Sequence, residues 1–221
     1  MPREAISSGI ATDALAPMLH PARTALVIID VQRDFAAPDG AMAQVGCDVS
    51  DVETVIDRIE RLIAAARTAG ASLAFIRVVT EAKTDSRALK LFYERQGYPA
   101  EALDMCRAGT PGADYYRVQP QPDDIEVQKL LFSSFVGTDF DSQLKARGID
   151  TLVVTGLTTE CCVDCTVRDA FHRNYSCFLV DDACSAYGED AHIAAMSGLM
   201  KNCALAVSSQ AVEAVWTGDE A

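Results

Sequence analysis

Positively charged residues are scarce in this chain of 221 residues, in which 19 lysines and arginines stand against 32 aspartates and glutamates. The formal net charge is −13. Nucleic-acid binding needs a basic surface that offsets the phosphates, so this composition argues against a nucleic-acid partner. The chain also lacks any apolar run of about 18 residues or more, the length that a membrane helix requires. The sequence therefore predicts neither a nucleic-acid partner nor a membrane partner.

A secretion signal is not evident either, because the first residues show no charged segment followed by an apolar stretch. This predicts a cytoplasmic protein, in which the eight cysteines are free thiols rather than a disulfide framework. Hydrophobic residues make up 49% of the chain, which is enough for a sizeable core. We expect an N-terminal arm over residues 1–20 and a single domain over residues 21–221.

Histidine is rare, with three residues in the chain, and His172 and His192 are isolated from other metal-ligating side chains. Structural zinc usually takes two close pairs of Cys or His ligands. Cys162 and Cys165 form one such pair without a second, so we expect no metal and no cofactor. The same Cys-x-x-Cys pair follows a strand and opens a helix, as in thioredoxin-like proteins, although an aromatic or proline-rich turn is missing. A thiol–disulfide oxidoreductase remains an alternative.

Apolar runs and helical periodicities alternate along the chain. Strands are expected at residues 25–30, 72–79, 125–128, 151–155, 177–180 and 204–207, and helices at 51–69, 86–96, 139–147, 160–174, 190–202 and 210–216. Such alternation implies right-handed crossovers. The sequence therefore predicts an α/β fold, a three-layer α-β-α sandwich with a mostly parallel, doubly wound sheet.

Chemically active side chains follow three of the predicted strands. Asp30 ends the first strand, Lys129 follows the third, and the cysteines of the segment from Thr155 to Phe171 open the helix after the fourth. Ligands of such sheets bind beyond the carboxyl ends of the strands. With Thr158 and Thr159 as caps, Cys161 and Cys162 lie in the first helical turn, where the dipole lowers a thiol pKa. Neighbours on a helix point about 100° apart, so one of the two cysteines is expected to face this edge, and helix geometry does not choose between them.

Three ordered segments carry a resemblance to a known family: LVIIDVQRDF at 26–35, EVQK with SSF at 126–129 and 133–135, and VTGLTTECCV at 154–163. From about Leu19 onward the chain resembles the isochorismatase-like cysteine hydrolases. The resemblance implies a triad of Asp30, Lys129 and Cys162, and an oxyanion hole formed by the N–H groups of Thr158 and Cys162. It also implies a cis peptide bond between Leu157 and Thr158, and a homodimer or homotetramer.

Within that family the chain looks most similar to the ureidoacrylate, biuret and N-carbamoylsarcosine amidohydrolases. The resemblance implies a cysteine-dependent amidohydrolase that cleaves an amide or ureido/carbamoyl C–N bond of a small molecule through a thioester. A vinyl-ether hydrolase of the isochorismatase type is an alternative. The segment at residues 77–83 lacks the metal-binding histidines of nicotinamidases. Predicted substrate contacts are Gln32, Phe35, Phe132, Phe135 and Thr159.

Two further expectations concern charged residues. Arg77 follows the second strand, where it could bind a substrate carboxylate or lie in solvent or at an interface. Glu160 and Arg168 are expected to pair across the surface of their helix.

Overall fold

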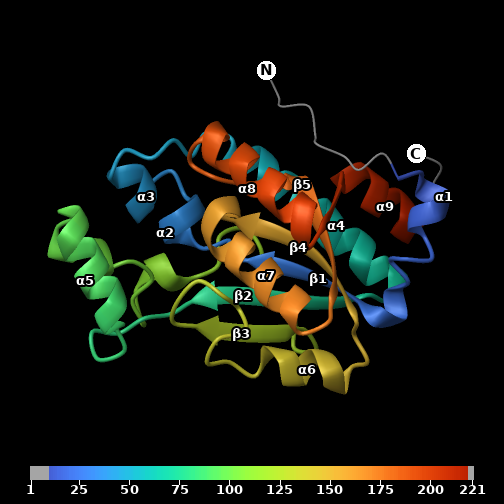
Figure 1. Cartoon of the computed structure of the whole chain (residues 1–221), viewed down its shortest axis with the longest axis horizontal. Helices are drawn as coiled ribbons and strands as arrows, with labels where there is room; N and C mark the ends of the chain where they lie inside the picture. Colours follow the sequence, from blue (N-terminus) through green and yellow to red (C-terminus); the bar gives the residue numbers. More distant parts are fainter. Residues whose placement is uncertain (1–9, 219–221) are drawn as a thin grey trace.

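A single parallel sheet forms the centre of the computed structural model, which describes residues 10–218 (Figure 1). Within these residues the sheet has six strands in the order β3-β2-β1-β4-β5-β6, and all neighbouring pairs are parallel. The strands are β1 (Thr24–Ile29), β2 (Ser72–Val78), β3 (Ile125–Lys129), β4 (Thr151–Leu157), β5 (Ser176–Ser185) and β6 (Leu205–Val207). The predicted doubly wound sheet is confirmed.

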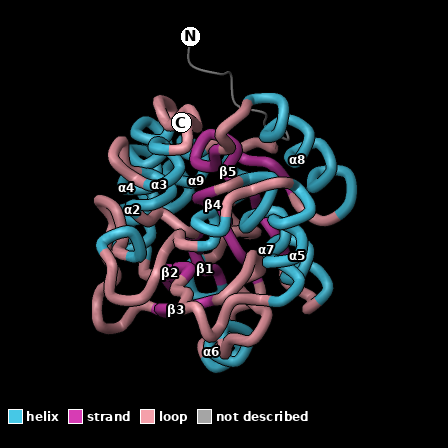
Figure 2. Tube along the Cα trace, turned by 90° about the vertical axis from the view of Figure 1, so that its left-hand side faces the viewer, coloured by secondary structure: helices cyan, strands magenta, loops and turns pink. Residues whose placement is uncertain are grey.

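Helices cover both faces of this sheet. The α-helices are α1 (Thr12–Leu15), α2 (Arg33–Ala36), α3 (Ala41–Gln44), α4 (Val52–Ala69), α5 (Arg87–Gln96), α6 (Phe140–Ala146), α7 (Asp164–His172), α8 (Glu189–Asn202) and α9 (Ser209–Thr217). Residues of α1, α4 and α9 share one core cluster, and residues of α6, α7 and α8 share the other. Figure 2 shows the strands lying between these two groups of helices, so the three-layer prediction is confirmed.

Burial explains why the strands and helices form where they do. All six residues of β1 are buried, as expected of a central strand with both faces covered. The longest helix, α4, buries a stripe at helical spacing that includes Val55, Ile59 and Leu62. It ends at Gly70, whose φ of 75° suits the left-handed position after a helix. None of the helices in residues 10–218 combines the length and hydrophobicity needed to cross a membrane.

The N-terminal arm packs on the domain. Leu15 and Leu19 are 0% exposed and belong to the core cluster of α4 and α9. The indole N–H of Trp216 in α9 donates to the Leu19 carbonyl at 3.1 Å. The arm was expected over residues 1–20, and the part of it at residues 1–9 lies outside the described residues. From Leu15 onward the chain therefore contributes to the core.

The helix predicted after β4 differs from expectation at its start. Residues Thr159–Val163 form a π-helical turn, η4, and the α-helix α7 begins only at Asp164. Neither Thr158 nor Thr159 caps this turn through its side chain, contrary to the prediction. Short π-helical segments occur frequently at functional sites. The implied cis peptide bond between Leu157 and Thr158, just before η4, is confirmed.

The strand order reverses between β1 and β4, and this reversal locates the binding crevice of a doubly wound sheet. Gly156 of β4 lies opposite Ile29 of β1, and its φ is 114°. A Cβ atom at Gly156 would overlap the carbonyl oxygen of Ile29. Glycine is therefore required here for the two strands to approach each other at the point where the sequence places Asp30 and the cysteines.

Candidate active site

Asp30 and Lys129 form a buried ion pair at the carboxyl edge of the sheet. The residues come from the ends of β1 and β3, yet Lys129 Nζ lies 2.7 Å from Asp30 Oδ2. Both residues are 1% exposed. The other carboxylate oxygen, Asp30 Oδ1, is buried and has no hydrogen-bond partner in the described protein. An unsatisfied buried carboxylate oxygen carries an energetic penalty, and it is available to accept a proton or a donor from a bound molecule.

Lys129 uses all three of its N–H donors within the protein. Besides Asp30, the ammonium group donates to the carbonyl oxygens of Leu131 at 3.0 Å and Phe132 at 2.8 Å. An ammonium group has three donors and no acceptor. Lys129 is therefore fully coordinated, and its role in the site is to supply a positive charge at a fixed position.

The opposing charges also set the protonation of the pair. Burial raises the pKa of Asp30, while attraction to Lys129 and the nearby Cys162 thiol oppose this shift, and the net direction is upward. For Lys129, burial alone would lower the pKa, but attraction to Asp30 and Cys162 raises it above its ordinary value. Lys129 thus stays charged, while Asp30 is a carboxylate with increased affinity for a proton, as a general base requires.

Cys162 lies in η4 beside this pair and is 8% exposed. A hydrogen bond with Cys161 raises the pKa of the Cys162 thiol, and burial and the charge of Asp30 raise it further, whereas Lys129 lowers it. The net direction is upward, which corrects the expectation that the helix start lowers it. The resting Cys162 therefore carries its proton, and the proton has to leave when the sulfur reacts.

The two neighbouring cysteines differ from Cys162. The hydrogen bond with Cys162 lowers the pKa of Cys161, which is partly exposed. Burial raises the pKa of Cys165. Cys177 and Cys184 lie in the core cluster of α7 and α8. All eight cysteines are free, so the prediction of free thiols is confirmed.

The Cys165→Ser variant is expected to retain most of the turnover, because the thiol of Cys162 bonds Cys161 and not Cys165. We expect a loss of about 1 kcal/mol in the free energy of unfolding. The measurement is steady-state turnover together with urea unfolding. A thiol–disulfide oxidoreductase would behave differently: insulin reduction by the unmodified protein, lost in Cys165→Ser, would contradict this prediction.

Backbone groups around Cys162 are arranged by the turn itself. The carbonyl of Thr158 accepts from the N–H groups of Cys161 and Val163, each at 3.1 Å, and not from Cys162 between them. The loop after Lys129 is tied to the same region, since Ser134 bonds Thr166 of α7 through both its N–H and its hydroxyl. The segment that coordinates Lys129 and the helix that follows Cys162 are therefore held together.

Three of the predicted substrate contacts are engaged inside the protein. The Gln32 amide bonds the backbone of Val78 and the carbonyl of Ala113, and Gln32 is 0% exposed. Phe135 is 5% exposed and packs against other aromatic rings of the core. The Thr159 hydroxyl bonds His192. Substrate contact by these three residues stays a prediction.

Phe132 is 40% exposed beside Lys129, and Phe35 is half-buried with its carbonyl bonded by the Tyr187 hydroxyl at 2.8 Å. Substrate contact by these two phenylalanines stays a prediction. Two tyrosines that sequence reasoning missed also lie near the thiols. Burial raises the pKa of Tyr93 in α5, and the charge of Cys161 raises it further. Burial also raises the pKa of Tyr187, and Cys162 adds a smaller increase. No sequence motif singles them out.

Arg77 and Arg168 each form an ion pair within the protein. Arg77 pairs with Glu126 at 3.0 Å and stacks over the Tyr115 ring, with 5.2 Å to the ring centroid. Arg168 pairs with Asp164, four residues earlier, at 2.7 Å. The predicted pairing of Arg168 with Glu160 is therefore wrong, because one helical turn brings Asp164 rather than Glu160 within reach.

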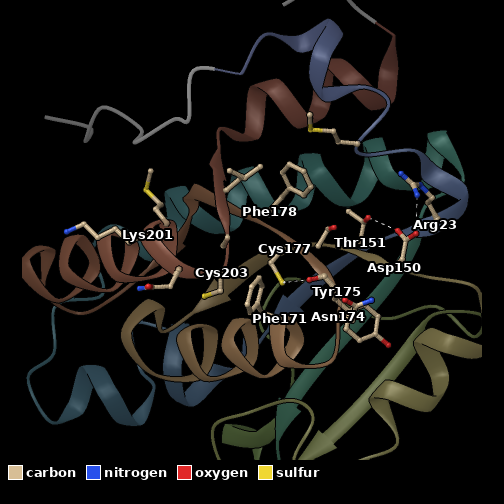
Figure 3. A pocket seen from close by; sticks show the side chains of 16 residues that line it. Arg23, Asp150, Thr151, Phe171, Asn174, Tyr175, Cys177, Phe178, Lys201 and Cys203 are labelled. Carbon is tan, nitrogen blue, oxygen red and sulfur yellow. Dashed lines mark hydrogen bonds and ion pairs between the residues drawn. The ribbon is translucent and has the colours of Figure 1, made fainter.

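A depression of about 970 Å³ lies at the opposite end of the sheet from this site. Its lining includes Arg23, Asp150, Phe171, Lys201 and Cys203 (Figure 3). These residues surround the amino ends of β4, β5 and β6, away from the carboxyl edge that holds Asp30 and Cys162. Within residues 10–218, no three or more His, Cys, Asp or Glu side chains lie together so as to hold a metal ion.

A carboxylate, an ammonium group and a thiol meet at the carboxyl edge of this doubly wound sheet. Such a set of groups is typical of a hydrolase with an α/β fold. A family model described as the isochorismatase domain matches residues 24–211. The chain belongs to the isochorismatase family, and the predicted family and hydrolase class are confirmed.

Individual relatives agree with this assignment. The chain is 36% identical over 194 residues to the ureidoacrylate amidohydrolase RutB of Methylobacterium radiotolerans, covering 82% of this chain and 74% of that one. It is 37% identical over 185 residues to RutB of Variovorax paradoxus, covering 77% and 71%. A crystal structure of a cysteine hydrolase from Pseudomonas syringae pv. phaseolicola superposes over 100% of both chains with a TM-score of 0.77. Its sequence identity is 24%, so this likeness supports the fold alone.

Proposed function

We propose that this protein is a cysteine-dependent amidohydrolase that cleaves a C–N bond of a small amide or ureido/carbamoyl compound. The observation that carries the proposal is the buried Asp30–Lys129 pair, with Asp30 Oδ1 left without a partner beside the protonated Cys162. A base, a nucleophile and a fixed positive charge are the groups that nucleophilic hydrolysis needs. The RutB relatives, named as ureidoacrylate amidohydrolases, favour a ureido acid as the substrate.

The first half of the reaction forms a thioester. Asp30 accepts the Cys162 proton as the sulfur attacks the substrate carbonyl. The N–H groups of Thr158 and Cys162 form the oxyanion hole for the tetrahedral intermediate, in which one donor contributes about 3–4 kcal/mol. Asp30 then returns the proton to the nitrogen of the leaving group, the C–N bond breaks, and the acyl group stays on Cys162.

The second half regenerates the enzyme. Asp30 deprotonates a water molecule, which attacks the thioester carbonyl through the same oxyanion hole. The acid product leaves and the thiol regains its proton. Lys129 keeps its charge throughout and stabilises the negative charge that passes between Cys162 and Asp30.

The experiment tests a panel of compounds as substrates and measures the ammonia that each one releases. It contains ureidoacrylate, biuret, N-carbamoylsarcosine, nicotinamide and isochorismate. We expect turnover of a ureido or carbamoyl compound, with an acyl adduct on Cys162 in acid-quenched samples analysed by mass spectrometry. Pyruvate release from isochorismate without ammonia from the other compounds would identify the vinyl-ether hydrolase instead.

We also propose that the protein is a homodimer or homotetramer. Exposed apolar side chains in and just after α5 and in the loop after β3 support association: Phe92 is 54%, Tyr98 56%, Leu130 48% and Val136 58% exposed. Light scattering on the purified protein measures its mass, and a monomer at micromolar concentration would contradict this proposal.

A further inference from the structure

Thr159, His192 and Asp181 form a buried hydrogen-bond chain behind the nucleophile. Thr159 opens η4, His192 lies in α8 and Asp181 lies in β5. The Thr159 hydroxyl is 2.8 Å from His192 Nδ1, and His192 Nε2 is 2.8 Å from Asp181 Oδ1. Their exposed fractions are 0%, 1% and 0%. The chain thus connects three separate elements at a position that solvent does not reach.

The direction of the hydrogen bonds follows from the chemistry of the groups. A carboxylate only accepts, so Asp181 receives the Nε2 proton of His192. In a neutral imidazole the other ring nitrogen is then an acceptor. For a neutral ring, His192 Nδ1 accepts the proton of the Thr159 hydroxyl, and the hydrogen bond to Asp181 fixes that tautomer.

The turn that receives this bond has no side-chain cap of its own. Thr158 precedes η4 with no capping hydrogen bond from its side chain. A helix start normally has several N–H groups whose alignment depends on a cap or a tertiary contact. Here the side chain of the first residue of the turn is anchored by His192 instead. Thr158 and Cys162 carry the proposed oxyanion donors. Thr159 directly follows the first of them and lies about one turn before the second.

We propose that His192 is a positioning residue that acts through Thr159 to align the N–H groups of Thr158 and Cys162 toward the oxyanion. This inference rests on the proposed function. It assigns to His192 a role in the stabilisation of the tetrahedral intermediate rather than in the reactivity of the thiol. The hydrogen bonds of the His192 ring go to Thr159 and Asp181 and to none of the groups proposed to react.

The test separates these two effects by measuring hydrolysis and alkylation in the same variants. Alkylation of Cys162 by iodoacetamide forms a carbon–sulfur bond without an oxyanion, so it does not need the oxyanion hole. In Thr159→Val, which removes the hydroxyl at nearly constant volume, we expect kcat to fall about tenfold to a hundredfold, part of the 10²–10³ seen when one donor is lost. KM and the Cys162 alkylation rate, mapped by mass spectrometry, are expected to stay within about threefold of the unmodified protein.

Matched variants identify the bond that matters. Thr159→Ser keeps the hydroxyl and is expected to restore most of the turnover lost in Thr159→Val. In His192→Asn the amide oxygen occupies the place of Nδ1 and accepts from Thr159, whereas His192→Gln reaches toward Asp181 without that acceptor. We expect the asparagine variant to retain more kcat than the glutamine variant. Circular dichroism and melting temperatures verify that each variant folds.

Each outcome decides the inference. Unmodified kcat in folded Thr159→Val would overturn it, as would a parallel loss of hydrolysis and alkylation, which would show that the chain maintains the turn as a whole. A loss of kcat alone, with rescue by serine, supports it. If the unmodified protein hydrolyses no compound of the panel, the proposed function fails together with this inference. That failure differs from a failure of the inference alone, which is seen only in the variants of an active protein.

Discussion

Replacing Cys162 by alanine is expected to reduce amide hydrolysis by at least about 10⁴-fold, because no thioester can form without the sulfur. The fold should survive, since the side chain is small and the lost contacts correspond to about 1 kcal/mol of unfolding free energy. The measurement is ammonia release under saturating substrate, with circular dichroism to verify the fold. The acyl adduct expected by mass spectrometry for the unmodified protein should be missing from the variant.

Cys161→Ala is the matched control, because it alters the adjacent thiol in the same turn. The hydrogen bond between the two thiols is the largest cause of the raised Cys162 pKa, so its removal should lower that pKa. Alkylation of Cys162 should then begin at lower pH, while hydrolysis persists. Loss of activity in Cys161→Ala with full activity in Cys162→Ala would contradict the assignment and make Cys161 the nucleophile.

Lys129→Ala is expected to lower turnover by about 10²–10³-fold, the scale of a lost charge stabiliser. Lys129 lowers the pKa of both Asp30 and Cys162. Without it both pKa values rise, so Asp30 keeps a proton up to a higher pH and the thiolate forms only at higher pH. Breaking a buried ion pair costs about 3–5 kcal/mol of stability, so the assays belong at low temperature, with the folded fraction verified.

The pH dependence of Cys162 alkylation measures this effect, and its midpoint should move to higher pH in Lys129→Ala. Lys129→Arg should rescue little. The Lys129 side chain is 0% exposed and its ammonium group bonds three fixed acceptors, a geometry that a planar guanidinium does not reproduce. An unchanged alkylation profile with near-normal turnover in Lys129→Ala would show that Lys129 only pairs with Asp30 and takes no part in catalysis.

Much of the fold was predictable because its strands are buried on both faces. The run from Ala25 to Ile29 is apolar without interruption, and the stripe of α4 is amphipathic over its whole length. Boundaries that depend on tertiary contacts were less accurate. The strand predicted at residues 177–180 extends to Ser185, since pairing with β4 continues past an irregularity near Gly156. The π-helical start of the helix after β4 has no local signal in the sequence.

The supporting residues of the site could not be predicted for a related reason. His192 lies 33 residues from Thr159 and looked like an isolated histidine, and no motif indicated that the Gln32 amide bonds the backbone of Val78. Which side chain meets which backbone group depends on how the loops fold over the sheet edge. Hydrogen bonds of this kind, such as the one from Gln32 to Val78 across 46 residues, leave no spacing pattern along the chain.

By itself the sequence determined the layered α/β fold, the family, and the strand ends that bear Asp30, Lys129 and the cysteines. These properties follow from periodicity and from motifs that are local in the chain. Only the tertiary structure decided that Asp30 Oδ1 remains unpartnered, that Lys129 uses all its donors within the protein, and that the pKa of Cys162 is raised. Protonation depends on burial and on charges a few ångströms away, and these are set only when strands distant in sequence meet at one edge.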